Sequence, residues 1–508
     1  MLLDDLAAAS IDVGATSARS AKVARLAVAL RALAPDEVAA GALFLAGELP
    51  QRQIGVGWAA LRDPPPTAAR PELTVAGVDA ALTTIGALAG AGSQGARREA
   101  LRALLGRATA REQRFLAALL GGELRQGALQ AVVADAVAQA AAVPREAVRR
   151  ALMLRGDLGA VAAIALRDGE PGLRAIGLEV GRPVQPMLAA PAKDLDAALA
   201  RVGERAAIEV KLDGARIQVH RRDGDVAVFT RTLDEITARV PEVVEAVLAL
   251  DARTLVLDGE AIALDAGRRP LPFQVTGARL ASSTSVATLR ERTPLTPSFF
   301  DVLHVDGRDL LDEPLAARAR ALAGAVPEAL RVPRAEIAGA EAAAAFQRDA
   351  LESGHEGVMV KALDAPYAAG RRGAGWLKVK PVHTLDLVVL AAEWGHGRRR
   401  GWLSNLHLGA RAPGGEGFVM LGKTFKGLTD AMLAWQTERL LALATRRERH
   451  VVHVRPELVV EIAFDGVQTS PRYPGGVALR FARVVRYRED KRADEADTLD
   501  AVLAVQRR

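Results

Sequence analysis

The first part of the chain follows a helical pattern of apolar positions. Alanine and leucine recur at helical spacing, and the pattern breaks at residues 63–70 and 90–96, where proline, glycine and serine gather. We therefore predict an all-α N-terminal domain over residues 1–175. Arginines lie on one side of the apolar positions in residues 101–142, which is typical of a solvated helix face and also of a surface that grips phosphates.

The pattern changes after a stretch near residues 166–189, where glycine and proline are frequent and helical periodicity is lost. Short β-type runs such as residues 206–212 and 254–264 then alternate with helical stretches such as residues 241–250. This alternation predicts an α+β domain built on antiparallel sheets over residues 183–382.

The last part of the chain, from about residue 383, is almost wholly of β type. A helical stretch at residues 429–444 is the main interruption. A small β-barrel over residues 383–508 is the expected architecture.

Composition narrows the possible chemistry. The 508 residues include no cysteine, which excludes disulfides and thiolate sites, so any metal must be held by oxygen or imidazole. No apolar run is long enough to span a bilayer, and Asp4 and Asp5 stand where a secretory signal would be positive, so we expect a cytoplasmic protein. The formal net charge of +6 favours a polyanionic partner such as nucleic acid.

Residues 417–424, GFVMLGKT, match the P-loop pattern G-x-x-x-x-G-K-[ST]. A P-loop needs a flexible turn between a strand and a helix, so that its backbone N–H groups point at phosphate. Here the variable positions Phe418 to Leu421 form an apolar β-type run, and FKG follows Thr424 in place of a helix. We therefore interpret the segment as a strand or hairpin, with Lys423 and Lys426 facing nucleic acid.

The segment IEVKLDGARIQV, residues 208–219, carries the most informative chemistry. Side chains alternate along a strand, so Glu209, Lys211 and Asp213 share one face while apolar residues occupy the other. A lysine between two carboxylates beside an Asp-Gly turn would, on its own, indicate an ordinary hairpin with surface charges. The segments that follow it along the chain favour a functional interpretation.

Four later segments add charged and aromatic side chains to strand faces. They supply Asp258 and Glu260 in residues 255–264, Phe300 beside Asp301 in residues 298–307, Glu356 and Lys361 in residues 355–361, and Trp376, Lys378 and Lys380 in residues 376–381. Lysines at alternate strand positions repel one another unless an anion lies between them, which indicates a bound phosphate. Carboxylates from separate strands suit Mg²⁺ held through oxygen and water.

In this order the segments resemble the nucleotidyltransferase motifs of ATP-dependent DNA ligases, and the resemblance extends over essentially the whole chain. It implies that the three predicted regions are, in order, a helical DNA-binding domain, an adenylation domain and a C-terminal OB-fold barrel. Residues 123–127, ELRQG, and 156–162, GDLGAVA, resemble the helical domain of such ligases. Leu212 and Ala482 depart from common family residues without removing a reacting group.

The resemblance also implies residue roles. Lys211 matches the KxDGxR lysine that becomes adenylylated, Glu209 the residue that reads the adenine amine, and Phe300 the aromatic that stacks on adenine. Further nucleotide-site roles are implied for Arg216, Arg231 (ribose or nick phosphate), Glu260 and Glu356 (ribose and metal), Trp376, and Lys361, Lys378 and Lys380 (phosphates), and, in residues 478–491, for Arg480, Arg483, Asp490 and Lys491 (leaving pyrophosphate).

The implied reaction uses ATP and Mg²⁺. AMP passes from Lys211 to the 5′-phosphate at a nick in duplex DNA, and the 3′-hydroxyl then displaces AMP. An RNA ligase or a GTP-using capping guanylyltransferase also carries KxDG, and a non-catalytic DNA-binding clamp could share the fold. The large helical domain and the basic C-terminal motif favour a DNA substrate, and the family pattern implies a monomer.

Overall fold

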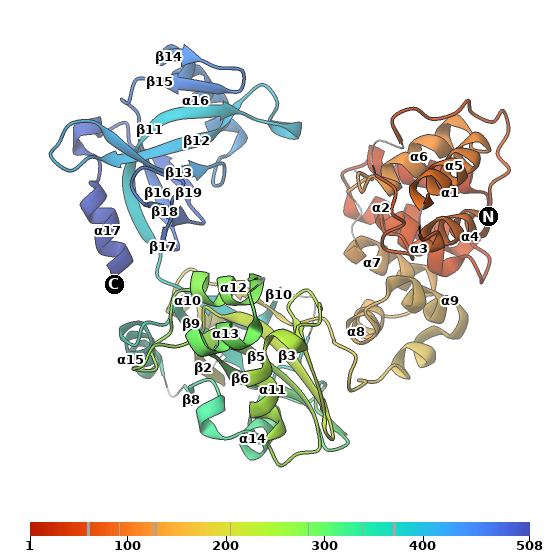
Figure 1. The fold of residues 1–508 in the computed structure, drawn as a ribbon, viewed down its shortest axis with the longest axis horizontal. Helices are drawn as coiled ribbons and strands as arrows, with labels where there is room; N and C mark the ends of the chain where they lie inside the picture. Colours follow the sequence, from red (N-terminus) through yellow and green to blue (C-terminus); the bar gives the residue numbers. More distant parts are fainter. Residues whose placement is uncertain are drawn as a thin grey trace.

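The computed structural model describes residues 1–57, 61–90, 92–124, 126–127, 130–203, 205–282, 284–337, 339–368 and 372–507. Figure 1 shows three successive groups of elements along the chain: helices, then strands with helices, then a mostly β group. Of the helices in these residues, none is long and apolar enough to cross a membrane.

The N-terminal group is helical, as predicted. Its helices are α1 (Leu3–Ala15), α2 (Arg19–Ala32), α3 (Val38–Ala46), α4 (Val75–Ala87), α5 (Ser93–Gly106), α6 (Ala110–Leu120), α7 (Gln130–Ala140), α8 (Arg145–Arg155) and α9 (Leu158–Arg174). Apolar positions at helical spacing, such as Leu26 and Leu30 of α2, are fully buried in one shared core. Helix α9 continues to Arg174 with a break at Gly169, so helix extends into the stretch where the sequence pattern predicted a linker.

The central group contains two five-stranded sheets. One has the order β1 (Leu188–Pro191), β10 (Arg372–Val379), β9 (Gly357–Ala362), β2 (Ala206–Lys211), β8 (Arg334–Glu336), and the other has the order β4 (Asp225–Thr230), β3 (Ala215–Arg222), β5 (Thr254–Ala263), β6 (Leu295–Val305), β7 (Arg308–Asp309). All pairings except that of β1 with β10 are antiparallel, which confirms the predicted sheet type.

The helices of the central group are α10 (Leu195–Val202), α11 (Pro241–Leu248), α12 (Phe273–Ala281), α13 (Val286–Arg292), α14 (Leu315–Ala325) and α15 (Ala340–Glu352). Helix α8 of the N-terminal group also contributes to this part, because its Met153 and Leu154 pack in one cluster with Val184 and Met187. The backbone of Val184 is held in turn by both polar atoms of the Gln218 side chain on β3. The chain between the helical and central groups is therefore anchored at both ends.

The C-terminal group is mostly β, as predicted. Its elements are β11 (His383–Trp394), β12 (Leu403–Arg411), β13 (Phe418–Thr424), α16 (Asp430–Ala442), β14 (Ala444–Arg447), β15 (Val451–Val454), β16 (Val459–Phe464), β17 (Gly466–Thr469), β18 (Val477–Arg480), β19 (Arg483–Tyr487) and α17 (Leu499–Arg507). The long strand β11 pairs with β12, β15 and β16, while β17 and β18 form a separate hairpin. Pairings among the described strands do not close into a ring, so the predicted barrel is not confirmed.

The P-loop match lies in a strand. Residues 418–424 form β13, and their backbone groups pair with β12 in an antiparallel ladder. Those N–H groups are therefore not arranged to cradle phosphate. This agrees with the interpretation of the segment as a strand. Lys423 forms an ion pair with Glu393 on β11. A nucleic acid phosphate at this position would therefore compete with Glu393 for the Lys423 ammonium.

Candidate active site

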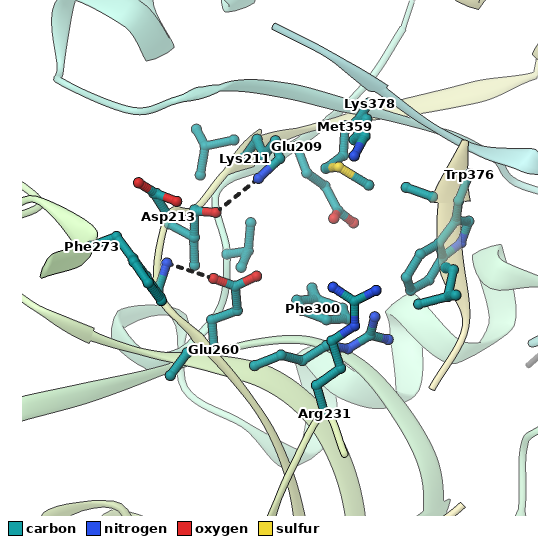
Figure 2. Close-up of a pocket in the computed structure, with 18 of the residues that line it drawn as sticks. Glu209, Lys211, Asp213, Arg231, Glu260, Phe273, Phe300, Met359, Trp376 and Lys378 are labelled. Carbon is teal, nitrogen blue, oxygen red and sulfur yellow. Dashed lines mark hydrogen bonds between the residues drawn. The ribbon is translucent and has the colours of Figure 1, made fainter. Parts of the chain in front are cut away.

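A cavity of about 460 Å³ lies between the two central sheets. Its lining includes many of the residues singled out in the sequence, namely Glu209, Lys211, Arg216, Arg231, Glu260, Phe300, Lys361, Trp376 and Lys378. Figure 2 shows Lys211 and Glu260 toward one end of this cavity and Trp376 at the other. Strands far apart in sequence thus bring cationic, acidic and aromatic side chains to one space.

Lys211 lies at the end of β2, where the chain turns sharply through Asp213 and Gly214. A Cβ atom at Gly214 would lie 2.6 Å from the carbonyl oxygen of Ala261, so only glycine fits against β5 at this position. The Lys211 ammonium forms an ion pair with Glu356, whose other carboxylate oxygen pairs with Lys380. Burial alone would raise the pKa of Glu356, but the contacts with Lys211 and Lys380 outweigh burial and lower it.

Glu260 is a second carboxylate near Lys211. Its Oε2 accepts a hydrogen bond from the Gly214 backbone N–H at 2.8 Å. Burial raises the pKa of Glu260 to about 7, although the positive charge of Lys211 and the Gly214 N–H oppose this shift. The two carboxylates beside Lys211 therefore differ in their affinity for protons.

The far end of the cavity is aromatic. The rings of Phe300 and Trp376 meet edge to face with centroids 5.7 Å apart. The Lys361 Nζ atom lies 3.9 Å from the Trp376 ring centroid and 2.5 Å from Glu209 Oε2. Lys361 is buried at this aromatic end, opposite Trp376 on the neighbouring strand. The arrangement combines flat apolar surfaces with a carboxylate acceptor, which suits a purine base.

Comparison with known proteins decides the family. The sequence pattern described as "ATP dependent DNA ligase domain" matches residues 186–380, "ATP dependent DNA ligase C terminal region" matches residues 399–491, and "DNA ligase N terminus" matches residues 61–138. The protein named "Probable DNA ligase" of Mycobacterium marinum is 58% identical over 512 residues, covering 99% of this chain and 100% of that protein. The chain belongs to the ATP-dependent DNA ligase family.

Other relatives agree with this assignment. A "Probable DNA ligase" of Anaeromyxobacter dehalogenans strain 2CP-1 is 61% identical over 507 residues, covering 99% of each chain. The solved structure named "Pmar-Lig_Pre." covers 95% of this ligase and 99% of that chain with a TM-score of 0.62 at 18% identity, a likeness of fold alone. The protein is thus an ATP-dependent DNA ligase, an enzyme of the nucleotidyltransferase type.

Arg216 of the ligase is held in the cavity wall by a network of hydrogen bonds. Its guanidinium donates two hydrogen bonds to Asp258, at 3.0 and 2.6 Å, and one to the Met187 carbonyl oxygen at 2.6 Å. The Tyr367 hydroxyl donates to the same Asp258 carboxylate at 2.6 Å. Because Asp258 is fully buried, this network fixes the position of Arg216, whose Cζ atom lies 5.5 Å from the Phe300 ring centroid.

The C-terminal residues of the ligase divide into two sets. Arg480 donates to Asp213, a residue of the cavity wall, at 2.7 Å, and Arg483 lies 3.3 Å from Asp465, which is 3.5 Å from Lys380. The second set points elsewhere: Arg488 and Lys491 bind Asp386 on β11, and Asp490 binds Arg488. The structure therefore brings Arg480 against the cavity wall but does not bring Asp490 or Lys491 there.

Two site residues were missed by reasoning from the sequence. Tyr367 is buried between Trp376 and Asp258, and Arg334 on β8 pairs with Glu209. Neither belongs to a segment with a recognisable strand-face pattern of charges, and each reaches the site through tertiary packing. A buried tyrosine or an arginine next to a proline gives no such signal by itself.

Proposed function

We propose that Lys211 is the nucleophile of this ligase. One observation carries the assignment: Lys211 lies at one end of a cavity whose other end, formed by Glu209, Phe300 and Trp376, suits adenine. ATP bound with its base at the aromatic end would direct its phosphates toward Lys211. Once deprotonated, the Lys211 amine attacks the α-phosphorus, a P–N bond forms, and the bond to pyrophosphate breaks.

The other side chains support this binding mode. Glu209 accepts a hydrogen bond from the adenine amine, and Phe300 and Trp376 enclose the base. The resemblance implies a phosphate contact for Lys361, but this lysine is buried between Glu209 and the Trp376 ring, so we propose that its charge acts at the base end of the cavity. Arg216 and Glu260 lie near the expected ribose position, and Arg231 follows β4 at the cavity wall, where ribose or a nick phosphate would pass. Lys378 and Lys380 contribute positive charge to the phosphates, and Arg480 and Arg483 contact the leaving pyrophosphate. For Asp490 and Lys491 a direct role in that step stays a prediction.

We propose that Glu260 and Glu356 hold Mg²⁺. Among the described residues, no three His, Asp or Glu side chains gather as a metal site. Mg²⁺ typically takes one or two carboxylates, with water and substrate phosphate supplying the remaining ligands. Two carboxylates flanking Lys211 fit that requirement. Bound Mg²⁺ would neutralise negative charge on the phosphates.

We propose the same three domains for the ligase that the sequence predicts: a helical DNA-binding domain over residues 1–175, an adenylation domain over 183–382 and an OB-fold domain over 383–508. The antiparallel strands around β11 support the last assignment. AMP then passes from Lys211 to the 5′-phosphate of a nick in duplex DNA, and the 3′-hydroxyl displaces AMP. We expect this enzyme to act as a monomer in the cytoplasm.

Intact-mass measurement tests the nucleophile and the nucleotide together. The ligase is incubated with Mg²⁺ and ATP, GTP or NAD in parallel, beside Lys211→Ala. An AMP adduct from ATP alone, absent in the variant, is the expected result. Added pyrophosphate should reverse an adduct that is already present after purification. An adduct that persists in Lys211→Ala would overturn the assignment.

A further inference from the structure

Arg334 joins the two sheets that enclose the cavity. It lies on β8, directly opposite Glu209 of β2 in the antiparallel register. Its Nε donates to Glu209 Oε1 at 2.6 Å, and its Nη2 donates to the Phe300 carbonyl oxygen on β6 at 2.5 Å. One guanidinium therefore contacts the carboxylate on one sheet and the aromatic residue on the other.

The surrounding backbone holds Arg334 in this bridging position. The Val332 N–H donates to the Phe299 carbonyl at 2.9 Å, and the Val210 N–H donates to the Pro333 carbonyl at 3.2 Å. Val332 and Pro333 thus run from one sheet to the other immediately before β8. The Arg334 side chain is 17% exposed and that of Glu209 only 2%, so water competes little for their contact.

Each carboxylate oxygen of Glu209 contacts a cationic side chain. Oε1 binds Arg334, and Oε2 lies 2.5 Å from Lys361. An arginine stays charged at every relevant pH, and its rigid planar fork spans Glu209 Oε1 and the Phe300 carbonyl oxygen at once. With Lys361 on its other oxygen, the Glu209 carboxylate therefore keeps a set direction relative to Phe300.

An acceptor at this position distinguishes purines. Adenine carries an amino group at position 6, which donates a hydrogen bond, whereas guanine carries an oxygen there, which a carboxylate repels. A site built to hydrogen-bond one group rejects the analogue that lacks it far better than an apolar pocket could. Discrimination by this route requires that the carboxylate cannot turn away or move closer to the ring.

We propose that Arg334 is a specificity-determining residue that positions Glu209 and Phe300 for a 6-aminopurine and against a 6-oxopurine. It acts through those two residues and not by touching the reacting atoms. The inference rests on the adenine contact proposed above for Glu209. It assigns selection of ATP over GTP to a residue outside the strand-face segments that the sequence marks.

The test compares self-adenylylation with self-guanylylation, followed by intact mass, in Arg334→Met, Arg334→Lys and Glu209→Gln. Methionine fills similar volume without charge or donors, and we expect the ratio of kcat/KM for ATP to that for GTP to fall at least tenfold. Lysine keeps the charge but lacks the planar fork, so it should give an intermediate ratio. A purely structural role would change thermal stability while leaving this ratio unmoved.

Arg279→Met is the matched control, since Arg279 is another buried arginine of the central group and pairs with Glu242. It should lower thermal stability with the ATP to GTP ratio within twofold of the unmodified enzyme. If Arg334→Met does not fold, Arg334→Lys decides, and an unchanged ratio there overturns the proposal. If Glu209→Gln also leaves the ratio unchanged, the proposed adenine contact fails. If Glu209→Gln lowers the ATP to GTP ratio and the Arg334 variants do not, the role of Arg334 fails while the adenine contact of Glu209 stands.

Discussion

Arg480 donates a hydrogen bond to Asp213 at 2.7 Å across 267 positions of sequence. Asp213 lines the cavity two residues after Lys211, and Arg480 ends β18 of the C-terminal hairpin. Lys380 and Asp465 add a second contact between the same two parts of the chain, at 3.5 Å. Figure 1 shows β17 at the end of the C-terminal group nearest to the central group. The hairpin therefore contacts the cavity wall beside Lys211.

Replacing Arg480 with alanine should slow self-adenylylation about tenfold, equivalent to about 1.4 kcal/mol of transition-state stabilisation. Both side chains of the pair are about one quarter exposed, so the loss should fall on the reaction more than on the fold. Single-turnover AMP transfer to the enzyme measures the rate. Arg472→Ala, an exposed arginine in the turn of the same hairpin, is the control and should react at the normal rate. An undiminished rate in Arg480→Ala would show that the contact does not serve this step.

Glu356→Gln should slow self-adenylylation at least a hundredfold and raise the Mg²⁺ concentration required. The substitution keeps the shape of the side chain but removes the negative charge between Lys211 and Lys380. Titration of the rate with Mg²⁺, with circular dichroism to verify folding, measures both effects. Glu352→Gln, an exposed glutamate at the end of α15, should behave like the unmodified ligase. An unaltered Mg²⁺ requirement in Glu356→Gln would count against a metal ligand at this position.

Strand alternation explains why much of the site was predictable. Glu209 and Lys211 share a face of β2, and Trp376 and Lys378 share a face of β10, because successive side chains on a strand point to opposite sides. The helical N-terminal group follows from the helical periodicity of its apolar residues. These periodicities are local properties, so the sequence contains them.

Contacts made by tertiary packing were not predictable. Arg334 and Tyr367 reach the cavity from segments without a charged strand face, and α8 packs Met153 against the central group although its pattern is that of the helical domain. The side chain of Asp490 binds Arg488 instead of reaching the cavity, and Arg488 is itself held by Asp386 on β11, about a hundred positions away in sequence. Closure of a barrel also depends on pairing between distant strands, and periodicity does not encode it.

Exposed arginines on α5 and α6 should contribute to DNA binding. Arg98 and Arg102 lie one helical turn apart on α5, and Arg114 lies on α6, all with exposed side chains. Replacing these three with glutamine should weaken binding to nicked duplex and make the dependence of log Kd on log salt shallower by about 0.9 for each lost phosphate contact. Self-adenylylation, which needs no DNA, should keep its rate.

The control for this prediction is Arg253→Gln, an arginine of the central group that is 80% exposed and pairs with Asp223. It should leave both the affinity and the salt dependence unchanged. Fluorescence anisotropy across a salt series measures both quantities. If the triple variant matched the control, the arginines would form a solvated helix face, the other interpretation that the sequence pattern allowed.

His220 should make the ligase less stable as the pH falls below about 6.5. Burial lowers the pKa of His220 to about 3, with a smaller contribution from His304. Its Nδ1 accepts a hydrogen bond from the Gly181 N–H at 3.0 Å, a contact that a protonated ring would lose. Between pH 6.5 and 3 the unfolded chain therefore binds one proton more than the folded chain, so stability rises with pH across this window. At pH 5.5, one unit below the pKa of about 6.5 in the unfolded chain, this linkage lowers the free energy of unfolding by about 1.4 kcal/mol.

His220→Gln removes the titrating ring, so its loss of stability between pH 7.5 and 5.5 should be smaller than that of the unmodified ligase. Thermal unfolding at the two pH values measures the difference, and carboxylates that titrate in both proteins cancel in the comparison. His396→Gln, at an exposed histidine, is the control and should retain the full pH dependence. Equal losses in His220→Gln and in the control would mean that the buried imidazole does not set the acid sensitivity of the fold. Because Gln218 contacts both His220 and the Val184 backbone, a confirmed effect would locate that sensitivity where the helical and central groups join.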